Sequence, residues 1–120
     1  MLMNVGVKEV LNRGNYTCFI FHDVDLLPEN DHVLYTCSDE PIHMSATRSY
    51  GGYKLPYPQY FGGVSAMSKE QFLVVNGFSN MFWGWGGEDD DMYNRIERRN
   101  MKIKRYNLGI ARYRVCVHLF

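Results

Sequence analysis

The sequence of 120 residues contains no long hydrophobic run and no excess of charge of either sign. Its apolar runs are only a few residues long, whereas an α-helix that crosses a bilayer needs about 20 apolar residues. Lys+Arg and Asp+Glu both number 13, so the net charge is zero, whereas a nucleic-acid-binding surface requires a basic face. The sequence therefore predicts neither a membrane-spanning helix nor a nucleic-acid partner.

A signal peptide is also missing, because Met1-Leu2-Met3 leads directly into a helix-like pattern. We therefore expect either a cytosolic protein or one whose targeting region lies outside this chain. Cysteine is scarce, and the odd set of Cys18, Cys37 and Cys116 fits either three reduced thiols or one disulfide with a spare thiol. Hydrophobic residues make up 46% of the chain, which predicts one globular domain, or part of one, rather than disorder.

The most unusual stretch that is present runs from residue 81 to residue 91. Trp83 and Trp85 alternate with glycines there, and four carboxylates, Glu88 to Asp91, follow without a break. Aromatic faces can bind the apolar side of a sugar ring while carboxylates bind its hydroxyls, so this pattern favours a sugar site. Part of the acidic run has a second explanation, because acids in the first turn of a helix complement its dipole.

Apolar periodicity along the chain predicts an α/β fold. Ser68 and Gln71 form a capping-box pattern at the start of one expected helix, which should end near Gly77. The expected helices are 5–13, 69–76 and 89–99. The expected strands are 16–21, 32–37, 42–47, 61–67, 101–106 and 111–117. The segments 26–31 and 49–54 are expected to be loops.

Asp23 and Asp25 follow the expected strand at 16–21. In an extended backbone, side chains two residues apart point to the same side, and ligands of open α/β sheets bind at the carboxyl ends of strands. Paired carboxylates at such an end suit a divalent cation that bridges to phosphate oxygens. A solvated turn is the alternative explanation for this motif.

Two blocks of the chain resemble the catalytic domain of the β-1,4-galactosyltransferase family. The first block is 21–26, and the second combines 57–68 with 83–91. The resemblance implies a GT-A type fold, with a mixed sheet and flanking helices. Residues 1–120 would form the C-terminal part of the family's catalytic domain, incomplete on its N-terminal side. The family's membrane anchor would lie outside the chain, and the family resides on the lumenal side of the Golgi membrane.

The resemblance also implies a reaction, in which galactose moves from UDP-galactose to the 4-hydroxyl of a terminal N-acetylglucosamine with inversion and with Mn²⁺ as cofactor. Asp89 matches the general base. The residues implied in donor binding are Asp23, Val24, Tyr60, Gly63, Trp85 and Glu88. Those implied in acceptor binding are Tyr57 and Asp90. The metal ligands would be Asp25 and His118.

Further expectations follow from the same resemblance. The bulk of Tyr60 goes with UDP-galactose as the donor rather than a donor that carries an N-acetyl group. Trp85 would belong to a mobile loop that closes over the substrates, with its flanking glycines as hinges. Cys18 and Cys37 match a disulfide pair, which suits a Golgi lumen.

The sequence departs from the family pattern at Val115. The family has a metal-binding methionine there, three residues before the histidine that matches His118, and valine cannot ligate. Cys116 either replaces the lost ligand or is a buried thiol. This departure keeps open an alternative function, an inactive relative that binds sugar or nucleotide. A structural Ca²⁺-binding acidic loop is a third possibility.

Overall fold

The strand β1 (Cys18–His22) and the strand β5 (Val64–Ser68) form the centre of the molecule. The computed structural model describes residues 2–116 of the chain. The strands pair antiparallel, and β3 (Ile42–His43) adds to the other edge of β5. Alternate side chains of β1 face opposite sides, because Phe19 and Phe21 pack in one apolar cluster and Ile20 in another. The expected strand at 16–21 is confirmed, shifted towards its carboxyl end.

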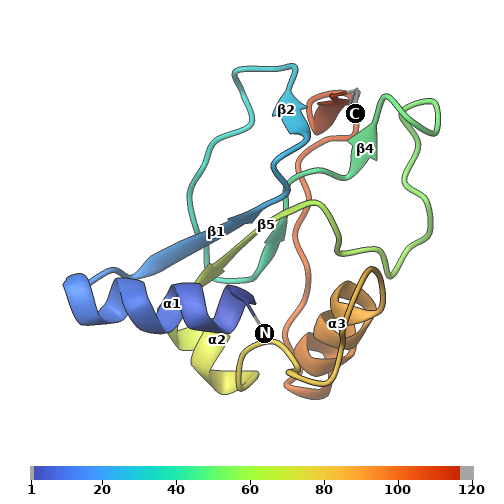
Figure 1. The fold of residues 1–120 in the computed structure, drawn as a ribbon. Helices are drawn as coiled ribbons and strands as arrows, with labels where there is room; N and C mark the ends of the chain where they lie inside the picture. Colours follow the sequence, from blue (N-terminus) through green and yellow to red (C-terminus); the bar gives the residue numbers. More distant parts are fainter. Residues whose placement is uncertain (1, 117–120) are drawn as a thin grey trace.

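Three helices contribute to the apolar cluster on the Phe19 side of this sheet (Figure 1). They are α1 (Leu2–Arg13), α2 (Lys69–Val74) and α3 (Glu88–Arg98). Val7, Phe72 and Met92 are the buried anchors of the three helices. The predicted capping box is present, since the Gln71 amide donates to Ser68 Oγ at 3.1 Å and the Ser68 amide donates to Gln71 Oε1 at 2.9 Å.

A second, smaller sheet lies at the end of β1 that leads to the acidic pair. It consists of β2 (Leu26–Pro28), β6 (Arg112–Val115) and β4 (Thr47–Arg48). β6 runs antiparallel to β2 and parallel to β4, so this sheet is mixed. Between residues 2 and 116 the chain is thus an α/β structure, as the sequence predicted. None of the helices in this part of the chain is long and apolar enough to span a membrane.

Four expected elements differ in the structure. The expected strand at 42–47 is divided into β3 and β4, which belong to different sheets. Segment 32–37 is not a strand, because the Thr36 amide bonds locally to the Leu34 carbonyl and Leu34 and Tyr35 are exposed. The expected strand at 101–106 is reduced to a single bridge between Lys104 and Ile42. The expected loop at 26–31 instead begins with β2, because β6, more than 80 residues later, supplies its pairing partner.

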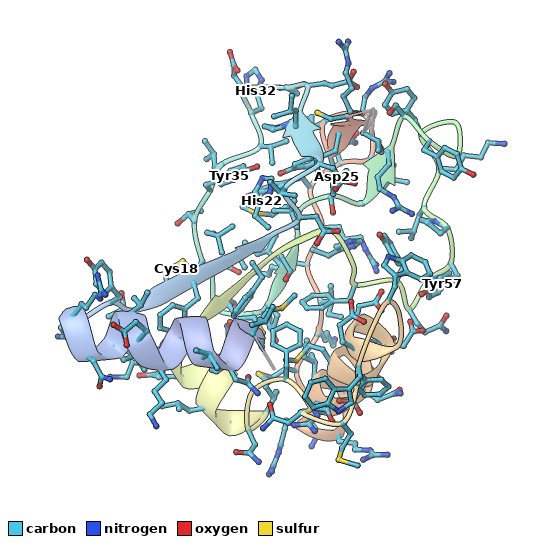
Figure 2. The ribbon with its side chains drawn as sticks, in the orientation of Figure 1. Cys18, His22, Asp25, His32, Tyr35 and Tyr57 are labelled. Atoms are coloured by element: carbon cyan, nitrogen blue, oxygen red, sulfur yellow. A yellow bond between two sulfur atoms is a disulfide. The ribbon has the colours of Figure 1, made fainter. Side chains whose placement is uncertain are left out.

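A disulfide joins Cys18 at the start of β1 to Cys37 in the irregular segment (Figure 2). This pair is the one that the family resemblance implied. The two Cα atoms lie 5.7 Å apart, within the usual range for a disulfide. Cys116 is a half-buried free thiol, so the alternative of three reduced thiols is wrong.

Candidate functional site

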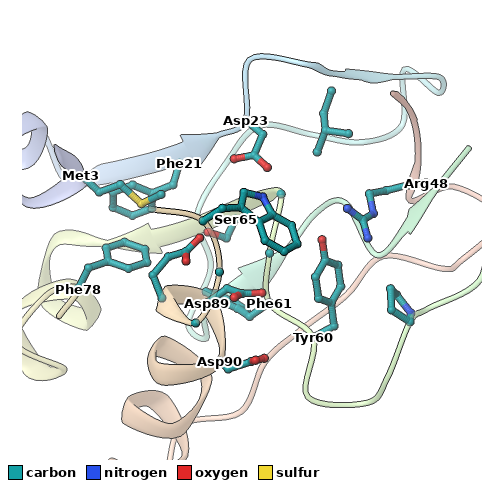
Figure 3. Close-up of a pocket in the computed structure, with 18 of the residues that line it drawn as sticks. Met3, Phe21, Asp23, Arg48, Tyr60, Phe61, Ser65, Phe78, Asp89 and Asp90 are labelled. Atoms are coloured by element: carbon teal, nitrogen blue, oxygen red, sulfur yellow. The ribbon is translucent and has the colours of Figure 1, made fainter. Parts of the chain in front are cut away.

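A cavity of about 480 Å³ lies where β1 and β5 meet the start of α3 (Figure 3). Its wall combines segments that are far apart in the sequence. They are the acidic turn 23–25 after β1, the loop 56–63 before β5, and the loop 83–87 that leads into α3, which we call the Trp loop. The wall includes most of the residues that the sequence singled out, which are Asp23, Asp25, Tyr57, Tyr60, Gly63, Trp85, Glu88, Asp89 and Asp90. Two predicted residues are not among them. Val24 is 94% exposed and does not line the cavity, and His118 lies outside the described residues.

The acidic pair is held in a turn rather than in the extended backbone that we expected. The Leu26 amide donates to the Asp23 carbonyl at 3.3 Å, and the Asp23 amide donates to the Gly63 carbonyl at 3.0 Å. The Cys116 amide donates to the Asp25 carbonyl at 2.7 Å. These bonds tie the turn to the strand β5 and to the end of β6. Both carboxylates still reach the cavity wall, while Val24 at the tip of the turn does not.

The four acids at the start of α3 separate into two groups. Glu88, Asp89 and Asp90 line the cavity. Asp91 instead pairs with Arg95 one turn later, with 2.7 Å between Arg95 Nε and Asp91 Oδ2. The charge of Asp91 is therefore balanced within the helix, whereas the other three acids face the cavity.

Asp89 is half-buried beside two other acids. Burial raises the pKa of its carboxyl, and the neighbouring charges of Asp90 and Glu88 raise it further. A carboxylate that binds a proton more readily than usual is a better acceptor in a proton transfer. Burial, together with Asp25 and Glu88, likewise raises the pKa of Asp23, while the positive charge of Arg48 lowers it.

Two tyrosines stand beside these acids. The Tyr57 hydroxyl donates a hydrogen bond of 2.7 Å to Asp90 Oδ1. The rings of Tyr57 and Tyr60 meet edge to face, with 5.5 Å between their centroids. Burial raises the pKa of Tyr60 to about 12, so its hydroxyl stays protonated at neutral pH and can donate a hydrogen bond.

Arg48 is a charged cavity residue that the sequence analysis missed. It is the one basic side chain on the wall within residues 2–116. Its guanidinium carbon lies 4.9 Å from the centroid of the Tyr60 ring, and in Figure 3 the side chain extends towards Tyr60. No described carboxylate lies within ion-pair distance of it. Its local sequence carries no signal of this role, since only the pairing of β4 with β6 brings it here.

The Trp loop projects into solvent beside the cavity. Trp85 is fully exposed although it stands at the cavity rim. Gly84 and Gly86 have φ angles of 81° and 96°, which side-chain-bearing residues rarely adopt. The base of the loop is anchored by Asn4 of α1, which accepts from the Phe78 amide at 2.9 Å and donates to the Phe78 carbonyl at 2.7 Å. A fixed base with glycines around an exposed tryptophan is suited to a loop that can close.

Only one of the two predicted metal ligands lies within the described residues. Asp25 lines the cavity, and its carboxylate is the hard oxygen type that suits a cation such as Mn²⁺. Val115 also stands on the wall and cannot ligate. Within residues 2–116, no group of three or more His, Cys, Asp or Glu side chains gathers closely enough to hold a metal ion. The other predicted ligand, His118, lies outside the described residues.

This α/β fold with an acidic, aromatic cavity belongs to a known class of transferases. Its shape is similar to that of a Drosophila β1,4-galactosyltransferase 7 catalytic domain solved with xylobiose, with a TM-score of 0.69 and 32% identity, over 82% of this chain and 42% of that one. A mutant of that enzyme, solved with manganese, UDP-Gal and xylobiose, matches at 31% identity and the same TM-score. The fold is therefore the GT-A type of galactosyltransferase catalytic domains.

Sequence comparisons agree. A family profile described as the N-terminal domain of galactosyltransferase matches residues 42–119, and one described as the N-terminal region of glycosyl transferase group 7 matches residues 1–38. The chain is 56% identical over 117 residues to β-1,4-galactosyltransferase 4 of Cricetulus griseus, and 55% identical to β-1,4-galactosyltransferase 1 of Homo sapiens, in each case over 98% of its length. The chain belongs to the β-1,4-galactosyltransferase family. It spans 34% and 29% of the lengths of those two relatives.

Proposed function

We propose that the protein transfers galactose from UDP-galactose to the 4-hydroxyl of a terminal N-acetylglucosamine, forming a β-1,4 linkage with inversion. The observation that carries this proposal is the convergence of Asp23, Glu88, Asp89 and Asp90 with two tyrosines on one cavity wall. Acids and aromatic rings together provide hydrogen bonds for sugar hydroxyls and stacking faces for sugar rings. Membership of the β-1,4-galactosyltransferase family supports the same reaction.

Asp89 acts as the general base. Its carboxylate takes the proton of the acceptor 4-hydroxyl while that oxygen attacks the anomeric carbon of galactose from the side opposite the phosphate. A new carbon–oxygen bond forms, the bond to the phosphate oxygen breaks, and UDP leaves with the electron pair. The raised pKa of Asp89 suits this step, because the proton passes to a base that is stronger than an ordinary aspartate.

The donor occupies the side of the cavity formed by Asp23, Gly63, Glu88 and Arg48, with Val24 against the nucleotide. The guanidinium of Arg48 offsets the negative charge of the diphosphate, which would otherwise face the carboxylates of the wall. Asp25 and His118 would hold Mn²⁺, which, when bound, neutralises charge on the departing diphosphate. Tyr60 limits the space beside the donor sugar, and Trp85 covers the substrates when its loop closes.

The acceptor lies against Tyr57 and Asp90. Their mutual hydrogen bond of 2.7 Å keeps the phenol ring and the carboxylate in a fixed relation. A ring face and an adjacent carboxylate match the apolar and hydroxyl-bearing sides of a pyranose. The disulfide between Cys18 and Cys37 fits an oxidising compartment, so we place the protein on the lumenal side of the Golgi membrane, with an anchor outside this chain as its contact with the membrane.

A second candidate function is a sugar- or nucleotide-binding module without transferase activity. The observation that favours it is Val115, an apolar residue on the cavity wall where the family has a metal-binding methionine. This candidate keeps the aromatic and acidic contacts to a ligand but lacks a complete metal site.

One assay separates the two candidates. The protein is incubated with UDP-galactose and N-acetylglucosamine, with and without Mn²⁺, and the disaccharide product is measured together with UDP binding. We expect Mn²⁺-dependent transfer in the wild type and its loss in Asp89→Asn with binding of UDP retained. Binding without transfer in the wild type supports the binding module instead. Transfer that survives Asp89→Asn rules out the general-base role.

A further inference from the structure

A completely buried histidine, His43, packs against Tyr60, which lines the cavity. His43 of β3 has no exposed surface. Its Nε2 lies 2.8 Å from the Gly62 carbonyl oxygen, and its Nδ1 lies 3.0 Å from Nε of Arg105. An arginine nitrogen can only donate, so Nδ1 is the acceptor and Nε2 carries the proton. The imidazole is therefore neutral, with a defined tautomer.

Arg105 extends the same network along the loop before β5. Its Nη2 donates to the Tyr60 carbonyl at 2.7 Å and to the Pro58 carbonyl at 2.9 Å. Together with the bond from His43 to Gly62, three carbonyl groups of the segment 58–62 are held by two side chains. These bonds link positions that are 19 to 62 residues apart in the sequence.

The network also contacts the Tyr60 ring itself. The His43 ring meets it edge to face, with 5.0 Å between centroids and an interplanar angle of 80°. Arg48 covers the ring, with its guanidinium carbon 4.9 Å from the centroid. The backbone of Tyr60 is therefore fixed by Arg105, and its ring is confined between His43, Arg48 and Tyr57.

Burial also affects the protonation of His43. Because burial lowers the pKa of His43 to about 3, the ring stays neutral over the physiological pH range. A protonated ring would lose its acceptor and would place two positive charges in contact. Within residues 2–116, no side-chain polar atom that is buried and shielded from solvent lacks a hydrogen-bond partner, so the network is fully satisfied.

We propose that His43 and Arg105 are positioning residues that set donor size selectivity by holding Tyr60 rigidly against the donor sugar. This inference rests on the proposed function, since it concerns the same donor site. A tyrosine on a loose loop would move aside for a larger sugar substituent. One that is fixed at its backbone carbonyl and at its ring excludes that substituent through steric overlap.

The test compares two donors that differ only at the 2-position of the sugar, UDP-galactose and UDP-N-acetylgalactosamine. The variant Arg105→Lys keeps the positive charge but removes the planar guanidinium, whose N–H groups donate to His43 and to the carbonyls of Pro58 and Tyr60. We expect the ratio of kcat/KM for the acetylated donor to that for UDP-galactose to rise about tenfold, mostly because activity with the larger donor increases. Lys102→Gln, an exposed neighbour, is the matched control and should leave the ratio unchanged.

A merely structural role gives a different result. If the network only stabilises the fold, Arg105→Lys lowers the melting temperature and reduces the activity with both donors equally, and an unchanged ratio overturns the proposal. His43→Gln, which retains a donor towards Gly62, provides a second test should Arg105→Lys fail to fold. Absence of transfer from UDP-galactose by the wild type contradicts the proposed function itself, whereas an unchanged ratio in an active protein contradicts the positioning role alone.

Discussion

The carboxylate of Asp89 lies directly against the backbone of Gly62. A methyl group on residue 62 would stand 2.8 Å from Asp89 Oδ2 and 2.8 Å from the Tyr60 ring. Atoms do not approach so closely without displacement, so the absence of a side chain at residue 62 allows the proposed base and the proposed donor wall to meet. The start of α3 and the loop before β5 are thereby brought together on the cavity wall.

Gly62→Ala should therefore impair catalysis more than folding. The new methyl group displaces Asp89 and Tyr60, and we expect kcat to fall by roughly 100-fold, because a misplacement of about 1 Å can cost that much. Steady-state kinetics together with a melting curve measures both effects. Gly6→Ala in α1 is the control: an added methyl there meets no atom within 4 Å and should leave kcat unchanged. Wild-type kcat in Gly62→Ala contradicts the close packing described here.

The acidic limb of the pH–rate profile should reflect Asp89. Protonated Asp89 cannot accept the acceptor's proton, so activity falls as the pH falls through its raised pKa. We expect the midpoint of this limb to lie above the ordinary aspartate value of 3.8. Asp90→Asn removes a neighbouring negative charge and should move the midpoint to lower pH. A midpoint that is the same in Asp90→Asn as in the wild type assigns the limb to another group.

Arg48→Gln should weaken donor binding in particular. Because the guanidinium offsets the charge of the diphosphate, we expect the Kd of UDP to rise about tenfold, equivalent to about 1.4 kcal/mol. The KM for the acceptor should change little, since Tyr57 and Asp90 are unaltered. Isothermal titration calorimetry with UDP measures the effect, and the exposed Arg99→Gln serves as the control. Equal UDP affinity in Arg48→Gln and the wild type would remove Arg48 from the donor site.

His43 should make the fold less stable in mild acid. Its pKa is about 3 in the folded protein and 6.5 ordinarily, so the unfolded chain binds an extra proton between these values. The stability contributed by the neutral ring is complete above pH 6.5 and is lost as the pH falls towards 3, by about 1.4 kcal/mol per pH unit. Urea unfolding at several pH values measures this slope. His43→Gln should reduce this slope by about 1.4 kcal/mol per pH unit, the contribution of one proton. If the slope is the same in His43→Gln and in the wild type, His43 does not cause it.

The disulfide should contribute strongly to stability. Cys18 and Cys37 are 19 residues apart, and closing a loop of this size restricts the unfolded chain by about 3 kcal/mol. We expect Cys37→Ser to lower the free energy of unfolding by this amount and to make it insensitive to reductant. Cys116→Ser, which affects only the free thiol, is the control for thiol loss. If reductant lowers the free energy of unfolding of Cys37→Ser as much as that of the wild type, the disulfide between Cys18 and Cys37 is not the cause of the effect.

Local chemistry made several elements predictable. The capping box of Ser68 and Gln71 forms between residues three apart, and Asp91 lies in the first turn of α3, where an acid complements the helix dipole. Such interactions are complete within one helical turn, so no distant partner is needed to form them. The aromatic and acidic residues of the cavity were recognisable for another reason, because their types and spacing are unusual in an ordinary core.

The sequence by itself determined the α/β class, the helices and the acids and tyrosines of the cavity, since these depend on neighbours within a few positions or on a distinctive motif. Only the tertiary structure decided which acids face the cavity, that Arg48 joins them, and that His43 and Arg105 hold the Tyr60 loop from behind. It also decided that segment 32–37 is irregular and that β2 pairs with β6. The physical reason is that each of these outcomes depends on a partner brought close by the folding of distant segments, and a local pattern carries no information about that partner.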